Sequence, residues 1–153
     1  MAVNPIPEGY HTVTPYLSIS NASEAIEFYK QAFNAEEIFR LSMPNGDVGH
    51  AEIKIGHSHL MLSDTCDEAP MPSPNQLGGT SVGIYLYVED VDALFAQALK
   101  AGATVIEAVE DKFYGDRTGS LKDPYGHVWF IGTHKEDLSP DEIEQRAAEM
   151  FSE

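Results

Sequence analysis

The chain has 153 residues, of which 42% are hydrophobic and 22% charged, a composition typical of a single folded domain. Lys and Arg total 9 against 25 Asp and Glu, and the formal net charge of −16 disfavours binding to phosphate backbones or anionic membrane surfaces. One cysteine, Cys66, excludes an intramolecular disulfide, and no apolar run approaches the ~20 residues of a spanning helix. Residues 1–8 lack the basic and apolar regions of a secretory signal. We therefore expect a cytoplasmic protein that binds neither nucleic acid nor membrane.

The first half of the chain predicts a strand, a helix and three more strands. Apolar and polar residues alternate over residues 11–20, which indicates a strand. Asn21 and Glu24 have the spacing of a capping box, apolar residues follow at helical spacing, and Asn34 is a typical left-handed stop. Three antiparallel strands joined by short hairpins are then predicted at 37–43, 48–55 and 59–64.

The second half repeats this order after a stretch with three prolines and no periodicity, residues 65–80, which we interpret as a linker or a lid loop. A strand is predicted at 81–88, followed by a helix that Asp90 caps and Gly102 ends. Further strands are predicted at 104–109, 114–122 and 127–133. A terminal helix starts with Ser139 as its N-cap and Pro140 at its first position.

The recurrence has a register that drifts by one residue. Tyr16 and Asn21 correspond to Tyr85 and Asp90 at an offset of 69 residues, and Gly49 corresponds to Gly119 at an offset of 70. We therefore predict one α+β domain made of two β-α-β-β-β modules, at about 8–64 and 80–134, with a linker at 65–79 and a C-terminal helix at 139–151. Each module is expected to have an antiparallel sheet with a helix on one face, and the other faces are expected to form a shared cavity.

Several segments resemble one known superfamily: Ala25-Ile-Glu-Phe-Tyr29, Phe113-Tyr-Gly-Asp-Arg117 and Asp123-Pro-Tyr-Gly-His-Val-Trp129, among others. With the paired modules, they make the chain similar to the vicinal oxygen chelate superfamily over residues 5–150. That group includes glyoxalase I, bleomycin- and fosfomycin-resistance proteins and extradiol dioxygenases. The resemblance implies the glyoxalase/bleomycin-resistance-like fold and a homodimer whose cavities are completed across the subunit interface.

The resemblance also implies where a metal would bind. The metal enzymes of the superfamily have four ligand positions, which fall here at Thr14, near residues 60–62, at Gly83 and at Phe130. A divalent metal needs nitrogen or oxygen donors, and these positions offer almost none. We therefore expect no metal and no cofactor, and no lactoylglutathione lyase activity.

Other residues provide an alternative ligand set. His50 and Glu52 share one face of a strand, and His134 lies at the end of the last one. Because no third ligand is expected opposite His50 and Glu52, we interpret them as pairing with cross-strand neighbours.

The candidate binding face follows from strand alternation. Thr14, Tyr16, Tyr85 and Tyr87 are predicted to share one face with Phe130. Aromatic rings around a few hydroxyls favour a pocket for a small apolar or aromatic ligand, although such rings can also simply fill a sheet interior. The candidate ligand-binding residues are Thr14, Tyr16, Tyr85, Tyr87, Tyr114, Arg117 and Phe130.

Three charged residues are candidates for catalysis. Arg117 is suited to bidentate capture of a carboxylate or phosphonate, and a salt bridge with one of the many acidic residues is the alternative. Glu52 and Asp64 could act as a general base if burial raised the pKa of either carboxyl. Two functions remain open: a metal-independent protein that binds a small hydrophobic or aromatic molecule, and a lyase, isomerase or dioxygenase-like enzyme with relocated catalytic groups.

Overall fold

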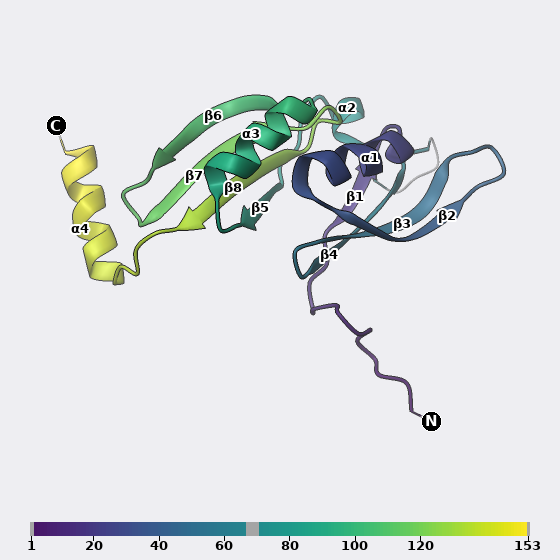
Figure 1. The fold of residues 1–153 in the computed structure, drawn as a ribbon, viewed down its shortest axis with the longest axis horizontal. Coiled ribbons are helices and arrows are strands. Elements are labelled where there is room, and N and C mark those ends of the chain that lie inside the picture. Colours follow the sequence, from purple (N-terminus) through teal and green to yellow (C-terminus); the bar gives the residue numbers. More distant parts are fainter. Residues whose placement is uncertain (1, 67–70, 153) are drawn as a thin grey trace.

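The computed structural model describes residues 2–66 and 71–152, which form two four-stranded sheets, each with a helix on one face (Figure 1). The first sheet has the order β1-β4-β3-β2 and the second the order β5-β8-β7-β6. The first module contains β1 (Tyr16–Ile19), α1 (Ala22–Phe33), β2 (Glu36–Ser42), β3 (Val48–Ile55) and β4 (Ser58–Asp64). The second contains β5 (Gly83–Tyr87), α3 (Val91–Ala101), β6 (Thr104–Asp111), β7 (Asp116–Lys122) and β8 (Val128–His134).

The register confirms the predicted repeat. Tyr16 pairs with Met61 in the first sheet, and Tyr85 pairs with Phe130 in the second. Both residues of the second pair lie 69 positions after their counterparts, which is the offset predicted from Tyr16 and Tyr85. The offset of 70 predicted from Gly49 is wrong, because Gly119 pairs with Ile131 and its counterpart in the first sheet is Ala51, which pairs with Leu62. The two modules therefore have the same strand order and the same cross-strand partners.

The sheets are mixed, and the expectation of purely antiparallel sheets was wrong for one strand pair in each. β1 runs parallel to β4 and β5 parallel to β8, whereas the other pairs are antiparallel. Because α1 returns the chain before β2, both β2 and β4 run in the direction of β1. The first strand is also shorter than the predicted range of 11–20, since Pro15 has no N–H to offer a ladder.

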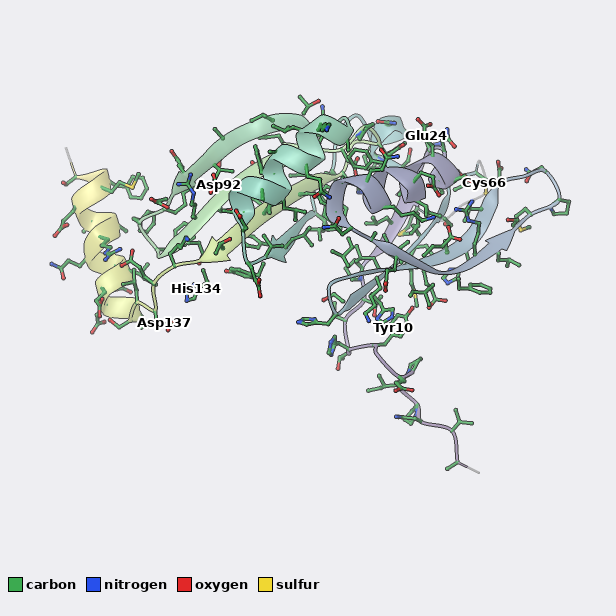
Figure 2. The ribbon with its side chains drawn as sticks, in the orientation of Figure 1. Tyr10, Glu24, Cys66, Asp92, His134 and Asp137 are labelled. Atoms are coloured by element: carbon green, nitrogen blue, oxygen red, sulfur yellow. The ribbon has the colours of Figure 1, made fainter. Side chains whose placement is uncertain are left out.

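The core lies between the sheets and the two helices, which are on the same side of the molecule (Figure 1). Leu17 and Ile19 point from β1 to this side, and Trp129 and Ile131 do so from β8; all four are buried. The helices α1 and α3 also contact each other, so the two modules share one core. Figure 2 shows Glu24 and Asp92 on the helix side and Tyr10 and His134 on the other.

The helix ends are mostly set by local residues. Asp90 accepts a hydrogen bond from Ala93 N at 3.1 Å, and Asn34 has the left-handed conformation predicted for a stop, with φ of 58°. The capping box predicted at Asn21 is wrong, because Asn21 itself is left-handed and makes no side-chain cap bond. The carboxylate of Asp64 accepts from Ala22 N at 2.7 Å instead, from the far end of the module.

The linker contains a short helix, α2 (Pro74–Leu77), that the sequence did not predict. Ser73 and Gln76 form a capping box at its start, and the Ser73 hydroxyl lies 3.0 Å from that of Ser20 at the end of β1. Residues 67–70 of the predicted linker or lid lie outside the described residues.

The predicted C-terminal helix is confirmed as α4 (Pro140–Phe151), with Ser139 accepting from Glu142 N at 3.2 Å. It lies beyond the end of the second sheet, away from the first module (Figure 1). Within residues 2–66 and 71–152, no helix is long and apolar enough to cross a membrane.

Candidate functional site

The face of each sheet opposite its helix, which we call its open face, carries exposed aromatic side chains. The first open face comprises Tyr16, Phe39, Leu41, His50, Glu52 and Met61. The second comprises Tyr85, Tyr87, Asp116, Thr118 and Phe130. Tyr87 is 64% exposed and Phe39 49%. On β5, by contrast, Ile84 and Leu86, which alternate with Tyr85 and Tyr87, pack against the core. Strand alternation therefore separates an apolar core from an aromatic surface, as the sequence predicted.

Asp116 is the centre of a hydrogen-bonded cluster on the second open face. Its Oδ2 accepts from the hydroxyls of Tyr85 at 3.0 Å and Tyr87 at 2.7 Å, while Oδ1 lies 2.8 Å from His134 Nδ1. The other imidazole nitrogen, Nε2, lies 2.7 Å from Asp137 Oδ1. Because a neutral imidazole has only one N–H, donation to both carboxylates specifies a protonated His134.

The electrostatics of this cluster follow from its contacts. Burial acts to raise the pKa of Asp116, but hydrogen bonds from His134, Tyr87 and Tyr85 outweigh it and hold that pKa below its usual value. Hydrogen bonds to Asp116 and Asp137 raise the pKa of His134. The hydrogen bond to Asp116, together with burial, raises the pKa of Tyr87, so its hydroxyl keeps its proton. With His134 protonated, the cluster contains two carboxylates, two phenols and an imidazolium.

Aromatic rings on this face lie over glycines of the neighbouring strand. A Cβ added to Gly83 would lie 2.5 Å from a ring carbon of Phe130, and one added to Gly132 would lie 2.5 Å from the Tyr85 hydroxyl. The rings of Tyr85 and Phe130 are nearly parallel, at 9°, with centroids 6.0 Å apart. The two glycines therefore let the rings lie close to the sheet and form a continuous aromatic surface.

A second cluster lies on the first open face. The Tyr10 hydroxyl donates to Glu52 Oε1, His50 Nε2 lies 3.3 Å from Glu52 Oε2, and the Tyr16 hydroxyl lies 2.9 Å from His50 Nδ1. Burial and the bond to Glu52 raise the pKa of Tyr10 to about 12. His50 and Glu52 thus pair with each other and with two tyrosines. Tyr10 was not among the sequence candidates, because it precedes the first strand.

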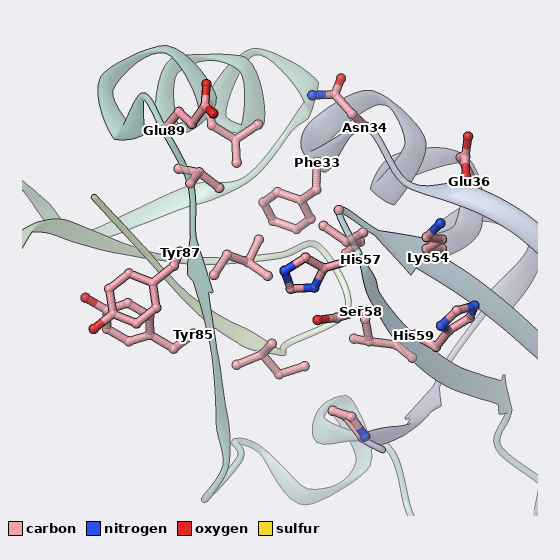
Figure 3. A pocket seen from close by; sticks show the side chains of 18 of the residues that line it. Phe33, Asn34, Glu36, Lys54, His57, Ser58, His59, Tyr85, Tyr87 and Glu89 are labelled. Carbon is pink, nitrogen blue, oxygen red and sulfur yellow. The ribbon is translucent and has the colours of Figure 1, made fainter. Parts of the chain in front are cut away.

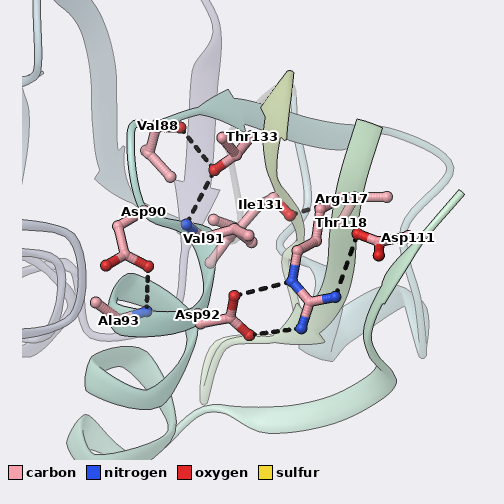
Figure 4. Close-up of polar contacts among 10 residues, drawn as sticks. All are labelled: Val88, Asp90, Val91, Asp92, Ala93, Asp111, Arg117, Thr118, Ile131 and Thr133. Atoms are coloured by element: carbon pink, nitrogen blue, oxygen red, sulfur yellow. Dashed lines mark hydrogen bonds and ion pairs between the residues drawn. The ribbon is translucent and has the colours of Figure 1, made fainter. Parts of the chain in front are cut away.

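Asp64 and Arg117 make their contacts away from the open faces. Both carboxylate oxygens of Asp64 accept backbone N–H groups at 2.7 Å, from Ala22 and Val48, so Asp64 holds the start of α1 against β3. Arg117 follows Asp116 on β7 and so points to the helix side, where it makes two hydrogen bonds of 2.9 Å to Asp92 on α3 (Figure 4). The structure does not bring these two residues to an open face.

A groove of about 1400 Å³ lies between the two modules. Thr14, Tyr85 and Tyr87 line it, together with the hairpin between β3 and β4, whose residues His57 and Ser58 face β5 across it (Figure 3). A smaller hollow of about 870 Å³ lies between Tyr114, Phe130 and the end of α4. The structure thus places Tyr16 on the first open face and gathers Thr14, Tyr85, Tyr87, Tyr114 and Phe130 in and around the two hollows.

The metal positions implied by the resemblance do not fit a divalent ion. The equivalent of Phe130 in the first module is Met61, because each pairs with the corresponding tyrosine, whereas the flanking leucines 60 and 62 face the core. The Phe130 ring fills the space above Gly83, and Thr14 has only a hydroxyl. Among the described residues, no group of three or more His, Cys, Asp or Glu side chains is arranged to hold a metal. His50 with Glu52, and His134, lie in separate modules.

Asp116, like Tyr10, was not among the sequence candidates. Its carboxylate organises the second open face, whereas the candidate predicted from this segment was its neighbour Arg117. Alternation along a strand was the signal that could have found it, because Asp116 and Arg117 cannot point to the same side.

The chain thus belongs to the class of proteins that are built from two β-α-β-β-β modules, and each of its modules has an open face that carries aromatic side chains. The family model of the Glyoxalase/Bleomycin resistance protein/Dioxygenase superfamily matches residues 10–131, and the chain belongs to this superfamily. Proteins that are similar in sequence match most of the length of this chain. An uncharacterised protein of Mycobacterium tuberculosis (strain ATCC 25618 / H37Rv) is 43% identical over 148 residues, covering 94% of this chain and 84% of that protein.

Solved structures share the fold. A gene product of Arabidopsis thaliana has a TM-score of 0.64 at 27% identity, covering 80% of this chain and 98% of that one. The genomically encoded fosfomycin resistance protein FosX of Listeria monocytogenes also has a TM-score of 0.64, at 15% identity, covering 87% of this chain and 97% of that one. At that identity, the likeness to FosX concerns the fold alone.

Proposed function

We propose that the protein binds a small apolar or aromatic molecule on its open faces without a metal. The observation that carries this proposal is the aromatic surface of Tyr85, Tyr87 and Phe130. It includes Phe130 and covers Gly83, two of the four positions where metal enzymes of this fold would have ligands. A planar ligand could stack there, and the rings bring a large apolar area for that contact. Exposure favours binding over mere filling of a sheet interior, since Tyr87 is 64% exposed.

We also propose that a second copy of the chain closes these faces. β1 and β5 lie at sheet edges and are hydrogen-bonded on one side only, and both open faces leave aromatic rings uncovered. An unprotected edge next to an apolar face invites further pairing, and a two-fold dimer is the commonest closed solution. In such a dimer the ligand would be enclosed between the copies.

Ligand binding can be tested by thermal shift with untagged, metal-stripped protein in a chelating buffer. We expect planar aromatic compounds to raise the melting temperature, and Tyr87→Ala to reduce the shift. Leu77→Ala is the matched control, because it removes an apolar side chain of similar exposure, 66%, from α2. An equal loss in both variants, or a shift that requires added metal, would contradict the proposal.

Metal independence has its own test. Zinc, nickel, cobalt and manganese are added separately to stripped protein, and isomerisation of the methylglyoxal–glutathione hemithioacetal is measured. We expect no turnover above the buffer rate, because Thr14, Met61, Gly83 and Phe130 offer at most one oxygen donor at the expected positions. Turnover that saturates at one metal per site would show that the ligands lie elsewhere.

One observation favours the alternative of an enzyme with relocated groups: the pairing of His50 with Glu52 on the partly exposed first open face. A histidine oriented by a carboxylate is a common general base. The metal titration above also tests this alternative. If it gives turnover, loss of that turnover in His50→Gln and Glu52→Gln would assign the catalysis to this pair.

The dimer is tested by sedimentation. We expect a dimer at micromolar concentration and a weaker one after deletion of residues 139–153. This deletion removes the apolar side chains Met150 and Phe151, which are 63% and 71% exposed. A monomer at high micromolar concentration would contradict the proposed closure.

A further inference from the structure

The hydrogen-bond donors around Asp116 are already used. The hydroxyls of Tyr85 and Tyr87 both donate to Asp116 Oδ2, and both ring nitrogens of His134 are engaged by carboxylates. The Thr118 hydroxyl, next on the same face, donates to Ile131 O at 2.8 Å. Each hydroxyl oxygen keeps lone pairs after donating its hydrogen. This end of the second open face therefore presents acceptors to an incoming molecule.

The charges around Asp116 also favour a ligand that donates hydrogen bonds and carries a positive charge. His134 carries one positive charge between two carboxylates, Asp116 and Asp137, which leaves this group with a net negative charge. Arg117 is held on the helix side by Asp92. The two cations that line the hollow beside Phe130 are also paired, Lys112 with Glu107 and Glu110, and Arg146 with Glu136. The whole chain carries −16, and a field of that sign attracts cations.

The rings beside this charge are suited to a cation as well. Tyr85 and Tyr87 have centroids 4.7 Å apart, and Phe130 continues the surface parallel to Tyr85. The faces of aromatic rings are electron-rich and attract ammonium groups, while their area accommodates an apolar body. An anion at this place would meet no donor of the Asp116 cluster and would face its negative charge.

Building on the proposed function, we propose that the ligand of the second open face is an organic cation, a protonated amine on an aromatic or apolar body. Its ammonium group would donate to the hydroxyl oxygens of Tyr85 and Tyr87, and the buried carboxylate of Asp116 behind them would supply the negative charge. Its apolar body would lie along Phe130.

Three tricyclic probes of similar size and different charge test this inference by fluorescence titration at pH 7. They are 9-(aminomethyl)anthracene as the cation, anthracene-9-methanol as the neutral probe and anthracene-9-carboxylate as the anion. We expect the cation to bind at least tenfold more tightly than the neutral probe, and the anion most weakly. Added salt should weaken binding of the cation and leave that of the neutral probe nearly unchanged.

Variants test whether the preference for a cation arises at Asp116 and Tyr87. Asp116→Asn should lower affinity for the cation about tenfold and leave the neutral probe within about twofold. Asp47→Asn, in the turn between β2 and β3, removes the same charge away from the second sheet and should change neither. Circular dichroism checks the fold, and if Asp116→Asn is unfolded, Tyr87→Phe removes one acceptor oxygen while keeping the ring. We expect Tyr87→Phe to weaken cation binding alone.

The outcomes separate the two proposals. Equal affinity for the cation and the neutral probe, unchanged in Asp116→Asn and Tyr87→Phe, would overturn the cation preference and leave aromatic binding intact. If the anion binds most tightly of the three probes, the cation preference is also wrong, and aromatic binding remains intact. If none of the three probes binds, the proposed aromatic site itself is wrong, and the cation preference is wrong with it.

Discussion

Replacement of Tyr29 by Phe should weaken the connection between the two modules. Tyr29 on α1 is fully buried, and its hydroxyl donates to Asp123 Oδ2 in the turn before β8 at 2.6 Å. The same carboxylate also accepts from Trp129 Nε1 at 2.9 Å and from two backbone N–H groups. A hydrogen bond to a charged acceptor contributes about 1.5–3 kcal/mol. Because the ring remains and Asp123 keeps three donors, we expect a loss of about 2 kcal/mol in unfolding free energy.

Urea unfolding followed by circular dichroism measures this loss, and thermal unfolding should show a fall of about 4–8 °C in melting temperature. Tyr125→Phe is the matched control. Tyr125 lies in the same aromatic cluster, and among the described residues its hydroxyl makes no hydrogen bond. If the two variants lose the same stability to within about 0.5 kcal/mol, the Tyr29 hydroxyl does not hold the modules together as argued.

The same bond gives a pH dependence. Burial, followed by the charge of Asp123, raises the pKa of Tyr29 well above its ordinary value. A group whose folded-state pKa is raised contributes stability below its unfolded pKa, here about 10, and that stability is lost as the pH rises further. The difference between the wild-type protein and Tyr29→Phe should therefore be constant from pH 7 to 9 and narrow above about pH 10. A gap that widens with pH would contradict the assignment.

Two further predictions concern the charged residues. In an NMR titration, the pKa of His134 should lie above its ordinary value of about 6.5, and Asp116→Asn should lower it. The contribution of the protonated His134 to stability should be complete below about pH 6.5 and should be lost as the pH rises through the folded-state pKa. An unchanged pKa in Asp116→Asn would show that the two side chains are not paired in solution. Arg117→Gln should alter the melting temperature by no more than about 3 °C and leave ligand affinity unchanged, because its partner Asp92 is exposed and lies on the helix side. A large loss of affinity would return Arg117 to the binding site.

The local parts of the fold could be predicted from the sequence because they depend on neighbouring residues. Asp90 and Ser139 cap helices through N–H groups three residues away, and Asn34 ends a helix by its own conformation. Alternation along β5 places Tyr85 and Tyr87 on one face whatever lies around the strand. These predictions were confirmed, since the interactions that fix them are contained in a few consecutive residues.

Long-range partners could not be predicted in the same way. Asn21 has the residue type and spacing of a cap, yet Asp64 fills that role from 42 positions away. Asp64 in turn was expected as a candidate base, but both its oxygens bind backbone N–H groups. A carboxylate accepts hydrogen bonds from the donors that the fold brings closest to it, and the distances to those donors cannot be predicted from the sequence.

By itself, the sequence determined that two β-α-β-β-β modules follow each other, and which side chains share a face of each strand. Which of those side chains contact one another depends on how the strands and helices pack. The tertiary structure gathered Tyr85, Tyr87 and His134 around Asp116, and it turned Arg117 towards Asp92 on the helix side. The physical reason is that periodicity records a direction along one strand. Hydrogen bonds and ion pairs, in contrast, depend on distances of about 3 Å between strands and helices that are distant in the chain.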